Sequence, residues 1–70
     1  MRTHFGMIMK NIRKKRRIFL YDQAKSLKLT ASELSRMEWG KMHVPSALIE
    51  NIIEVTDLTD EEVLQLRRCI

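Results

Sequence analysis

The stretch LKLTASELSRME, residues 27–38, decides the fold of this chain. Thr30 and Glu33 have the spacing of a capping box, in which the Thr30 side chain caps a helix and the Glu33 side chain bonds back to the Thr30 amide. Leu34 and Met37 follow at helical spacing and face inward. The stretch therefore predicts a short amphipathic helix that begins after Thr30.

A shorter helix precedes this one. Leu20, Ala24 and Leu27 recur at helical spacing, and only residues 28–30 separate the two helices. Gly40 ends the second of them, because glycine accepts the positive φ of a helix C-terminus. Two short helices on so tight a connection form a helix-turn-helix, whose second helix usually enters the major groove of DNA. An ordinary amphipathic surface helix is the alternative.

Three further helices are predicted, which gives an all-α fold: a compact bundle of five short helices in a single domain, residues 1–70. The first runs from Thr3 to Lys15, the fourth begins at Ser46 after Pro45, and the fifth follows a second capping box at residues 59–62. The predicted inward-facing residues of these three helices are Phe5, Ile8, Met9, Ile12, Leu48, Ile49, Ile52, Ile53, Val55, Val63, Leu64 and Leu66.

Composition excludes several classes of protein. The chain is 44% apolar and 31% charged, which is typical of a globular domain, and its uncharged runs are too short for a membrane span. Its one cysteine, Cys69, allows neither an internal disulfide nor a multi-cysteine zinc site. No catalytic grouping of Ser, His and acid and no Gly-rich phosphate loop occurs. We therefore expect a cytoplasmic protein that is not an enzyme, with no cofactor, metal or small-molecule substrate and no membrane partner.

Charge is distributed unevenly along the chain. Residues 1–41 hold eleven Lys or Arg and three Asp or Glu, giving +8, whereas residues 42–70 hold two basic and six acidic residues, giving −4. A basic half beside an acidic half favours the binding of a polyanion such as nucleic acid. The densest basic run is residues 13–17, for which a solvated helix face is the alternative interpretation.

Glu38 follows Leu34 by four residues, so its carboxylate leans toward the core, where a bare charge is costly. Arg13, four residues after Met9 on the border of the first apolar stripe, can supply the cation. We therefore expect an Arg13–Glu38 ion pair that holds the first helix against the third; an exposed Glu38 is the alternative.

These residues resemble the Xre/Cro-type phage-repressor helix-turn-helix family, whose fold is lambda-repressor-like. The resemblance covers roughly Phe5 to Leu66, and it rests on Leu27, Leu29-Thr30, residues 34–38, Gly40-Lys41, Phe5-Gly6 and Val44-Pro45. It implies the same ion pair. The family's base-reading positions fall on Ala31, Ser32, Glu33 and Arg36, and its DNA-backbone positions on Thr30, Lys41 and His43. We add Ser35, Trp39 and Lys14 to the backbone contacts, although Trp39 could instead cover the core.

Several residues depart from the family pattern. Lys28 stands where the family usually has Gly, in a turn that prefers positive φ, at a cost of about 1 kcal/mol. Phe19 and Leu20 replace a Ser or Thr cap and a phosphate-binding Gln, which leaves backbone amides for a phosphate contact there. Gln23 takes a normally apolar position, so we expect loose packing of the second helix. Ala31 replaces a common Gln.

Each base-reading residue has a defined chemistry. The planar fork of Arg36 can bond guanine O6 and N7 together, which gives about 1–3 kcal/mol of discrimination. Ser32 can bond either kind of base edge, and the Ala31 methyl can contact a thymine methyl. Glu33 could accept from a cytosine amine, but its capping role competes with this contact.

One recognition helix reads few bases, so we expect a homodimer that places two such helices about 34 Å apart. The C-terminal part, about residues 46–70, would also serve dimerisation, because its acidic surface stays away from phosphate. The predicted interface residues are Leu58, Val63, Leu64, Leu66 and Ile70, which could instead complete the core of a monomer.

The sequence thus predicts a sequence-specific regulator that binds double-stranded DNA in a bacterial or phage-infected cell. It would be a dimeric repressor that binds an inverted-repeat operator and occludes a promoter. The alternative is an interaction protein, such as an antitoxin whose main partner is a toxin. The charge of +8 on residues 1–41 argues against this alternative, since a pure protein binder does not need it.

Overall fold

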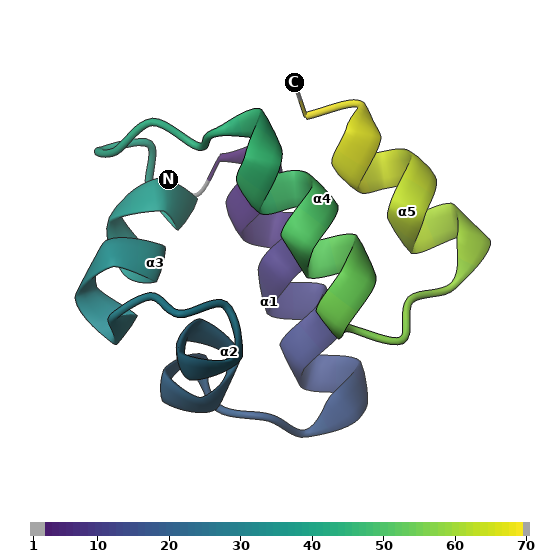
Figure 1. Cartoon of the computed structure of the whole chain (residues 1–70), viewed down its shortest axis with the longest axis horizontal. Helices are drawn as coiled ribbons and strands as arrows, with labels where there is room; N and C mark the ends of the chain where they lie inside the picture. The colour runs from purple at the N-terminus through teal and green to yellow at the C-terminus, as the bar shows by residue number, and fades with distance from the viewer. Residues whose placement is uncertain (1–2, 70) are drawn as a thin grey trace.

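Five α-helices make up the computed structural model, which describes residues 3–69 (Figure 1). In chain order they are α1 (His4–Arg16), α2 (Leu20–Ser26), α3 (Ala31–Glu38), α4 (Ser46–Val55) and α5 (Asp60–Arg67). The all-α prediction is confirmed, and no strand occurs among the residues that the structure describes. The first helix differs by one residue at each end from the predicted range, Thr3 to Lys15. It begins at His4, with Thr3 as its N-cap, and ends at Arg16.

Both predicted capping boxes are present. The Thr30 hydroxyl accepts from the Glu33 amide, and the Glu33 carboxylate accepts from the Thr30 amide at 2.9 Å. Thr59 and Glu62 repeat this arrangement at the start of α5. Gly40 follows the last turn of α3 with φ of +77°, as predicted for a residue that ends a helix.

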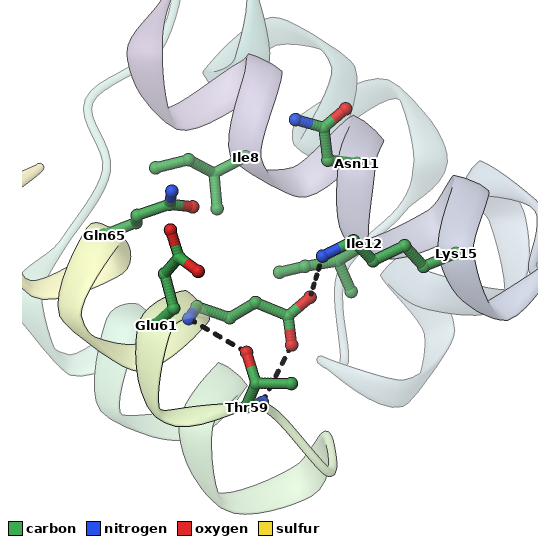
Figure 2. Close-up of a pocket in the computed structure, with 8 residues that line it drawn as sticks. Ile8, Asn11, Ile12, Lys15, Thr59, Glu61 and Gln65 are labelled. Atoms are coloured by element: carbon green, nitrogen blue, oxygen red, sulfur yellow. Dashed lines mark hydrogen bonds and ion pairs between the residues drawn. The ribbon is translucent and has the colours of Figure 1, made fainter.

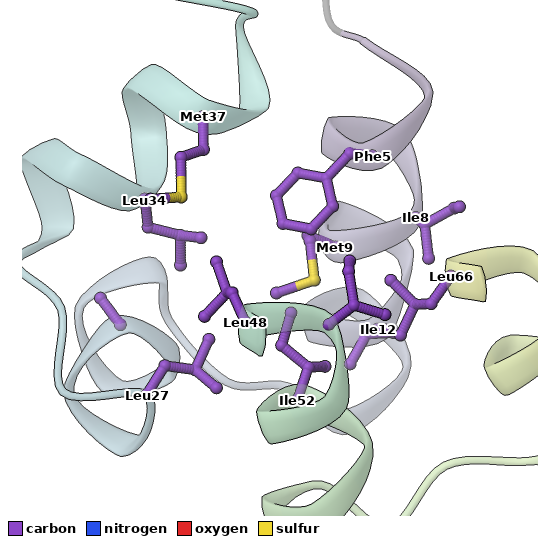
Figure 3. Packing of buried hydrophobic residues seen from close by; sticks show 12 residues of the cluster. Phe5, Ile8, Met9, Ile12, Leu27, Leu34, Met37, Leu48, Ile52 and Leu66 are labelled. Atoms are coloured by element: carbon purple, nitrogen blue, oxygen red, sulfur yellow. The ribbon is translucent and has the colours of Figure 1, made fainter. Parts of the chain in front are cut away.

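All five helices contribute to one hydrophobic core, and α1 runs through its middle. Figure 3 shows Phe5 and Met9 of α1 facing Leu34 of α3 and Leu48 of α4. The remaining buried apolar residues are Ile8, Ile12, Ala24, Leu27, Met37, Ile49, Ile52 and Leu66.

Two residues predicted to face inward do not. Leu64 is 50% exposed, because the inward face of α5 is formed by Glu62 and Leu66, four residues apart, and Leu64 lies between them on the opposite side. Val55 is 49% exposed, since it is the last residue of α4 and lies past the buried Ile52. The other residues of α4 predicted to face inward are buried or half-buried, so the prediction is wrong at one position in each of these two helices.

The N-terminal turn of α1 contacts the backbone at the end of α3. The Thr3 amide and the Thr3 hydroxyl both donate to the Glu38 carbonyl, at 3.0 and 2.9 Å. A Cβ atom on Gly6 would lie 2.3 Å from the same carbonyl oxygen. Gly6 therefore allows a close approach of two helices. This contact explains a glycine inside α1, although glycine costs about 1 kcal/mol relative to alanine in a helix.

A buried polar cluster joins α1, α2 and α3. The predicted Arg13–Glu38 ion pair is present, and both guanidinium Nη atoms donate to the carboxylate of Glu38, which is 2% exposed. Arg13 also donates to Gln23 Oε1 at 2.8 Å. The expectation of loose packing at Gln23 is wrong: its side chain is buried and bonded to Arg13, although its Nε2 atom has no hydrogen-bond partner.

A second ion pair, which the sequence analysis missed, joins α1 to α5. Arg16 donates to both carboxylate oxygens of the buried Glu62, at 3.0 and 2.8 Å, and to the Asp57 carbonyl at 2.6 Å. The hydrogen bond from Arg16, more than any other contact, lowers the pKa of Glu62 to about 2. Beside this pair, Asn11, Lys15, Glu61 and Gln65 help to line a small cavity of about 130 Å³ (Figure 2).

The Gly6 contact predicts that Gly6→Ala lowers the free energy of unfolding by about 1–3 kcal/mol, because the new methyl group meets a backbone carbonyl that cannot rotate away. Urea unfolding measures this change. Met7→Ala, at the neighbouring exposed position, should change stability by less than about 0.5 kcal/mol. A neutral or stabilising Gly6→Ala would contradict the close approach, since alanine is the better helix former.

The Arg16–Glu62 pair predicts a loss of stability in acid. Because the pKa of Glu62 lies below its ordinary value of 4.5, its contribution is present above about pH 4.5 and is lost as the pH falls toward 2. Glu62→Gln should lower the free energy of unfolding at pH 7 by about 2 kcal/mol, and the difference from the parent should shrink between those pH values. Denaturant unfolding across this range measures it. Glu61→Gln is the matched control at an exposed neighbour, and an identical pH dependence of the parent and Glu62→Gln would refute the pairing.

Candidate nucleic-acid interface

The outward face of α3 carries the predicted base-reading residues. Ser32 and Arg36 are exposed, whereas Ala31 and Glu33 are half-buried. The inward residues Leu34, Met37 and Glu38 of the same helix are buried, so α3 is anchored along one side and open along the other. The structure thus brings the four predicted residues together on one short helix, with Arg36 one turn beyond Ser32.

Glu33 is the one residue of these four whose side chain forms a hydrogen bond within the described part of the chain. Its carboxylate oxygen Oε1 accepts from the Thr30 amide at 2.9 Å, and this backbone hydrogen bond is the main cause that lowers the pKa of Glu33. The residue is therefore negatively charged at neutral pH, with one oxygen occupied by the cap. A base contact from Glu33 would have to use its other oxygen.

The predicted backbone-contacting residues are distributed around both ends of α3. Thr30 caps its start, and its hydroxyl oxygen accepts from Glu33. At the other end, the Lys41 amide donates to the Arg36 carbonyl at 2.8 Å and the Gly40 amide to the Met37 carbonyl at 3.2 Å, so that the chain turns sharply after the helix. Lys41 is exposed just beyond this turn.

The other four predicted backbone residues differ in exposure. Lys14 and His43 are exposed, and Ser35 is half-buried. Trp39, the C-cap of α3, is 42% exposed, so part of its side chain is covered and part lies at the surface. Both interpretations of Trp39 are consistent with this position.

The basic run 13–17 supplies less free charge than its sequence suggests. Arg13 is paired with Glu38 and Arg16 with Glu62, and Lys15 lies 3.9 Å from the Glu62 carboxylate. Positions 13 and 16 follow Met9 and Ile12 by four residues each, so they border the inward face of α1. Lys14 and Arg17 are exposed and have no ion pair among residues 3–69.

The predicted dimer residues do not form one exposed patch. Leu66 is fully buried, so its assignment to an interface is wrong: its side chain belongs to the core of the single chain. Leu58 and Val63 are half-buried and Leu64 is half-exposed, while Ile70 lies outside the described residues. Leu64 is thus the predicted interface residue best placed to contact a partner.

A larger open hollow, about 510 Å³, lies where the start of α1, the α3–α4 connection and the end of α5 meet. It is lined by His4, Met42, His43, Arg68 and Cys69 among others. Within residues 3–69 no three His, Cys, Asp or Glu side chains are grouped so as to hold a metal ion. The Cys69 thiol donates to the Gln65 carbonyl, and burial raises its pKa.

None of the helices in the described part of the chain is both long and apolar enough to cross a membrane. Comparison with protein-family models, with curated proteins and with solved structures gave no match to this chain. The resemblance to the Xre/Cro-type family stays a prediction that rests on the residues quoted for it.

Proposed function

We propose that the chain is a helix-turn-helix regulator that binds double-stranded DNA as a dimer and represses transcription by occluding a promoter. In this proposal α3 enters the major groove, and Arg36, Ser32 and Ala31 contact base edges while Lys41 and Thr30 contact phosphates. The observation that carries the proposal is the outward face of α3. It presents an exposed arginine and small hydrogen-bonding side chains on a helix whose other side is fully anchored.

The link between α2 and α3 supports the same function. The Leu29 amide donates to the Ala24 carbonyl at 2.9 Å, which folds the chain back directly after α2, and Lys28 adopts a positive φ of 60° there. α2 then packs on α3 (Figure 1), so the two helices form a unit of fixed shape. Such a unit can bring one helix into a groove while the other rests above it.

A second copy would contribute the other half of the binding site. Leu64 and Val55, on the acidic C-terminal part, are each about half exposed, and neither is used by the core. Acidic residues around them keep this side of the molecule away from phosphate. A protein partner of another sequence could use the same apolar residues, which makes an interaction protein the second candidate.

The base-reading role of Arg36 can be tested by selecting bound sequences from random duplex DNA. We expect an inverted repeat with half-sites about ten base pairs apart, and Arg36→Ala should weaken binding to it by about 5- to 150-fold, the equivalent of 1–3 kcal/mol. Fluorescence anisotropy with the selected duplex measures this loss. Lys10→Ala removes one positive charge from an exposed position of α1 that the proposal does not use, and should bind like the parent. Selection of no sequence, or an unaffected Arg36→Ala, would refute the base-reading role.

The dimer can be tested separately at Leu64. Leu64→Asp should weaken self-association by at least about tenfold, equivalent to about 1.4 kcal/mol, because it places a charge in an apolar contact. Its side chain is half-exposed, so the monomer should remain folded. Sedimentation equilibrium measures the association. Met7→Asp, at another exposed apolar position, is the control, and a parent chain that is monomeric at all concentrations would exclude the dimer.

A further inference from the structure

We propose that Arg17 is a phosphate-binding residue held in an unfavourable backbone conformation for the sake of its charge. The inference rests on the proposed function and deepens it, because it singles out one residue of the basic run 13–17 and gives the reason for its charge. Arg17 lies in the short connection between α1 and α2, directly before the unit formed by α2 and α3 (Figure 1). Two separate observations support this inference. The backbone conformation of Arg17 disfavours any side chain, and the neighbouring cations disfavour a further positive charge unless an anion binds there.

The first observation is the backbone conformation of Arg17. Its φ and ψ are 54° and 44°, in the left-handed region, where its amide closes the last turn of α1 by donating to the Arg13 carbonyl. The next amide, of Ile18, donates to the same carbonyl at 3.1 Å. Residues with a side chain adopt this region at a cost, whereas glycine adopts it freely. The turn itself therefore favours glycine over arginine.

The second observation is the charge around Arg17. The last turn of α1 already carries Lys14 and Lys15 besides the paired Arg13 and Arg16, so cations already lie beside the negative end of this helix. The positively polarised start of α2 follows only three residues later. Arg17 is exposed and has no ion pair within the described range, so it adds one more repelled cation to this corner. A bound polyanion would offset this repulsion, because its negative charges attract all of these cations.

The surroundings of Arg17 fit a DNA backbone. Lys14 lies one helical turn earlier and is also exposed without an ion pair among residues 3–69. Tyr21, in the first turn of α2, is 65% exposed and carries a hydroxyl that can donate to a phosphate oxygen. Lys14 in the last turn of α1, Arg17 in the connection and Tyr21 in the first turn of α2 are thus exposed at the α1–α2 connection, where they can contact phosphates in place of a side-chain contact from Phe19 or Leu20.

Lys28 provides a matched comparison at the opposite end of α2. It too is exposed, basic and left-handed, with φ of 60°. Both residues lie at the C-terminal end of a helix, but the last turn of α2 carries one basic residue, Lys25, so the helix dipole there still favours a further cation. The seven residues of α2, about 10 Å of helix, lie between the two positions in the chain.

The test compares Arg17→Gly with Lys28→Gly in the full chain. Each variant loses one positive charge and one strained side chain, so each should melt at a higher temperature than the parent. Only Arg17→Gly should bind a labelled duplex more weakly, and its slope of log K against log salt concentration should be smaller by about one. Arg17→Lys, which keeps the charge, should keep the parent slope. Thermal unfolding and anisotropy across a salt series measure both properties.

The outcomes separate this inference from the function on which it rests. If the parent binds the selected duplex through Arg36 but Arg17→Gly binds equally well, Arg17 is not a phosphate contact and the proposed function stands. Equal weakening by Lys28→Gly would show an effect of net charge alone and would also overturn the inference. A lower melting temperature of Arg17→Gly would show that no strain is stored at this residue. A parent chain that binds no duplex would refute the proposed function itself.

Discussion

The contact between α1 and the last residue of α3 fixes the geometry on which the rest of the molecule depends. The side chain of Glu38 is held by Arg13, and its backbone carbonyl accepts from the Thr3 amide and hydroxyl. Gly6 makes room for that carbonyl. Because one residue is held at both its side chain and its backbone, a rotation of α3 about its axis or a shift along α1 would break these contacts. The outward direction of Arg36 follows from this restraint.

The buried ion pair determines geometry more than it stabilises the fold. Removing two charges from water costs free energy, and the attraction between the two charges of a well-made pair does little more than offset this cost. A buried ion pair is therefore weak evidence for stability. The unpartnered Nε2 atom of Gln23 adds to this cost. In return, Arg13 reaches both Glu38 on α3 and Gln23 on α2. One guanidinium therefore sets the relative orientation of α1, α2 and α3, which an apolar contact would define less narrowly.

The sequence predicted what depends on neighbours within about one helical turn. Both capping boxes and the turn at Gly40 follow from local spacing, whereas the positive φ of Lys28 was expected from the family resemblance; all of them are present. The Arg13–Glu38 pair followed from two residues on the borders of apolar stripes, and the same argument applied to Arg16 and Glu62 would have found the second pair. The close approach at Gly6 could not be predicted this way, since it depends on how a distant helix docks. The buried Glu62 also explains the misassignment of Leu64, because a carboxylate occupies an inward position expected to be apolar.

The two ion pairs change what the uneven charge of the chain means. Arg16, from the basic part, pairs with Glu62, from the acidic part, so some of the asymmetry holds the two parts together and does not face solvent. The charge of Arg13 is likewise neutralised by its ion pair with Glu38. In the proposed function, the electrostatic attraction for DNA would then come from fewer residues, such as Lys14, Arg17, Arg36 and Lys41, which are exposed. Each of these side chains would contribute a larger share of the binding free energy than a count of the thirteen Lys and Arg residues would assign to it.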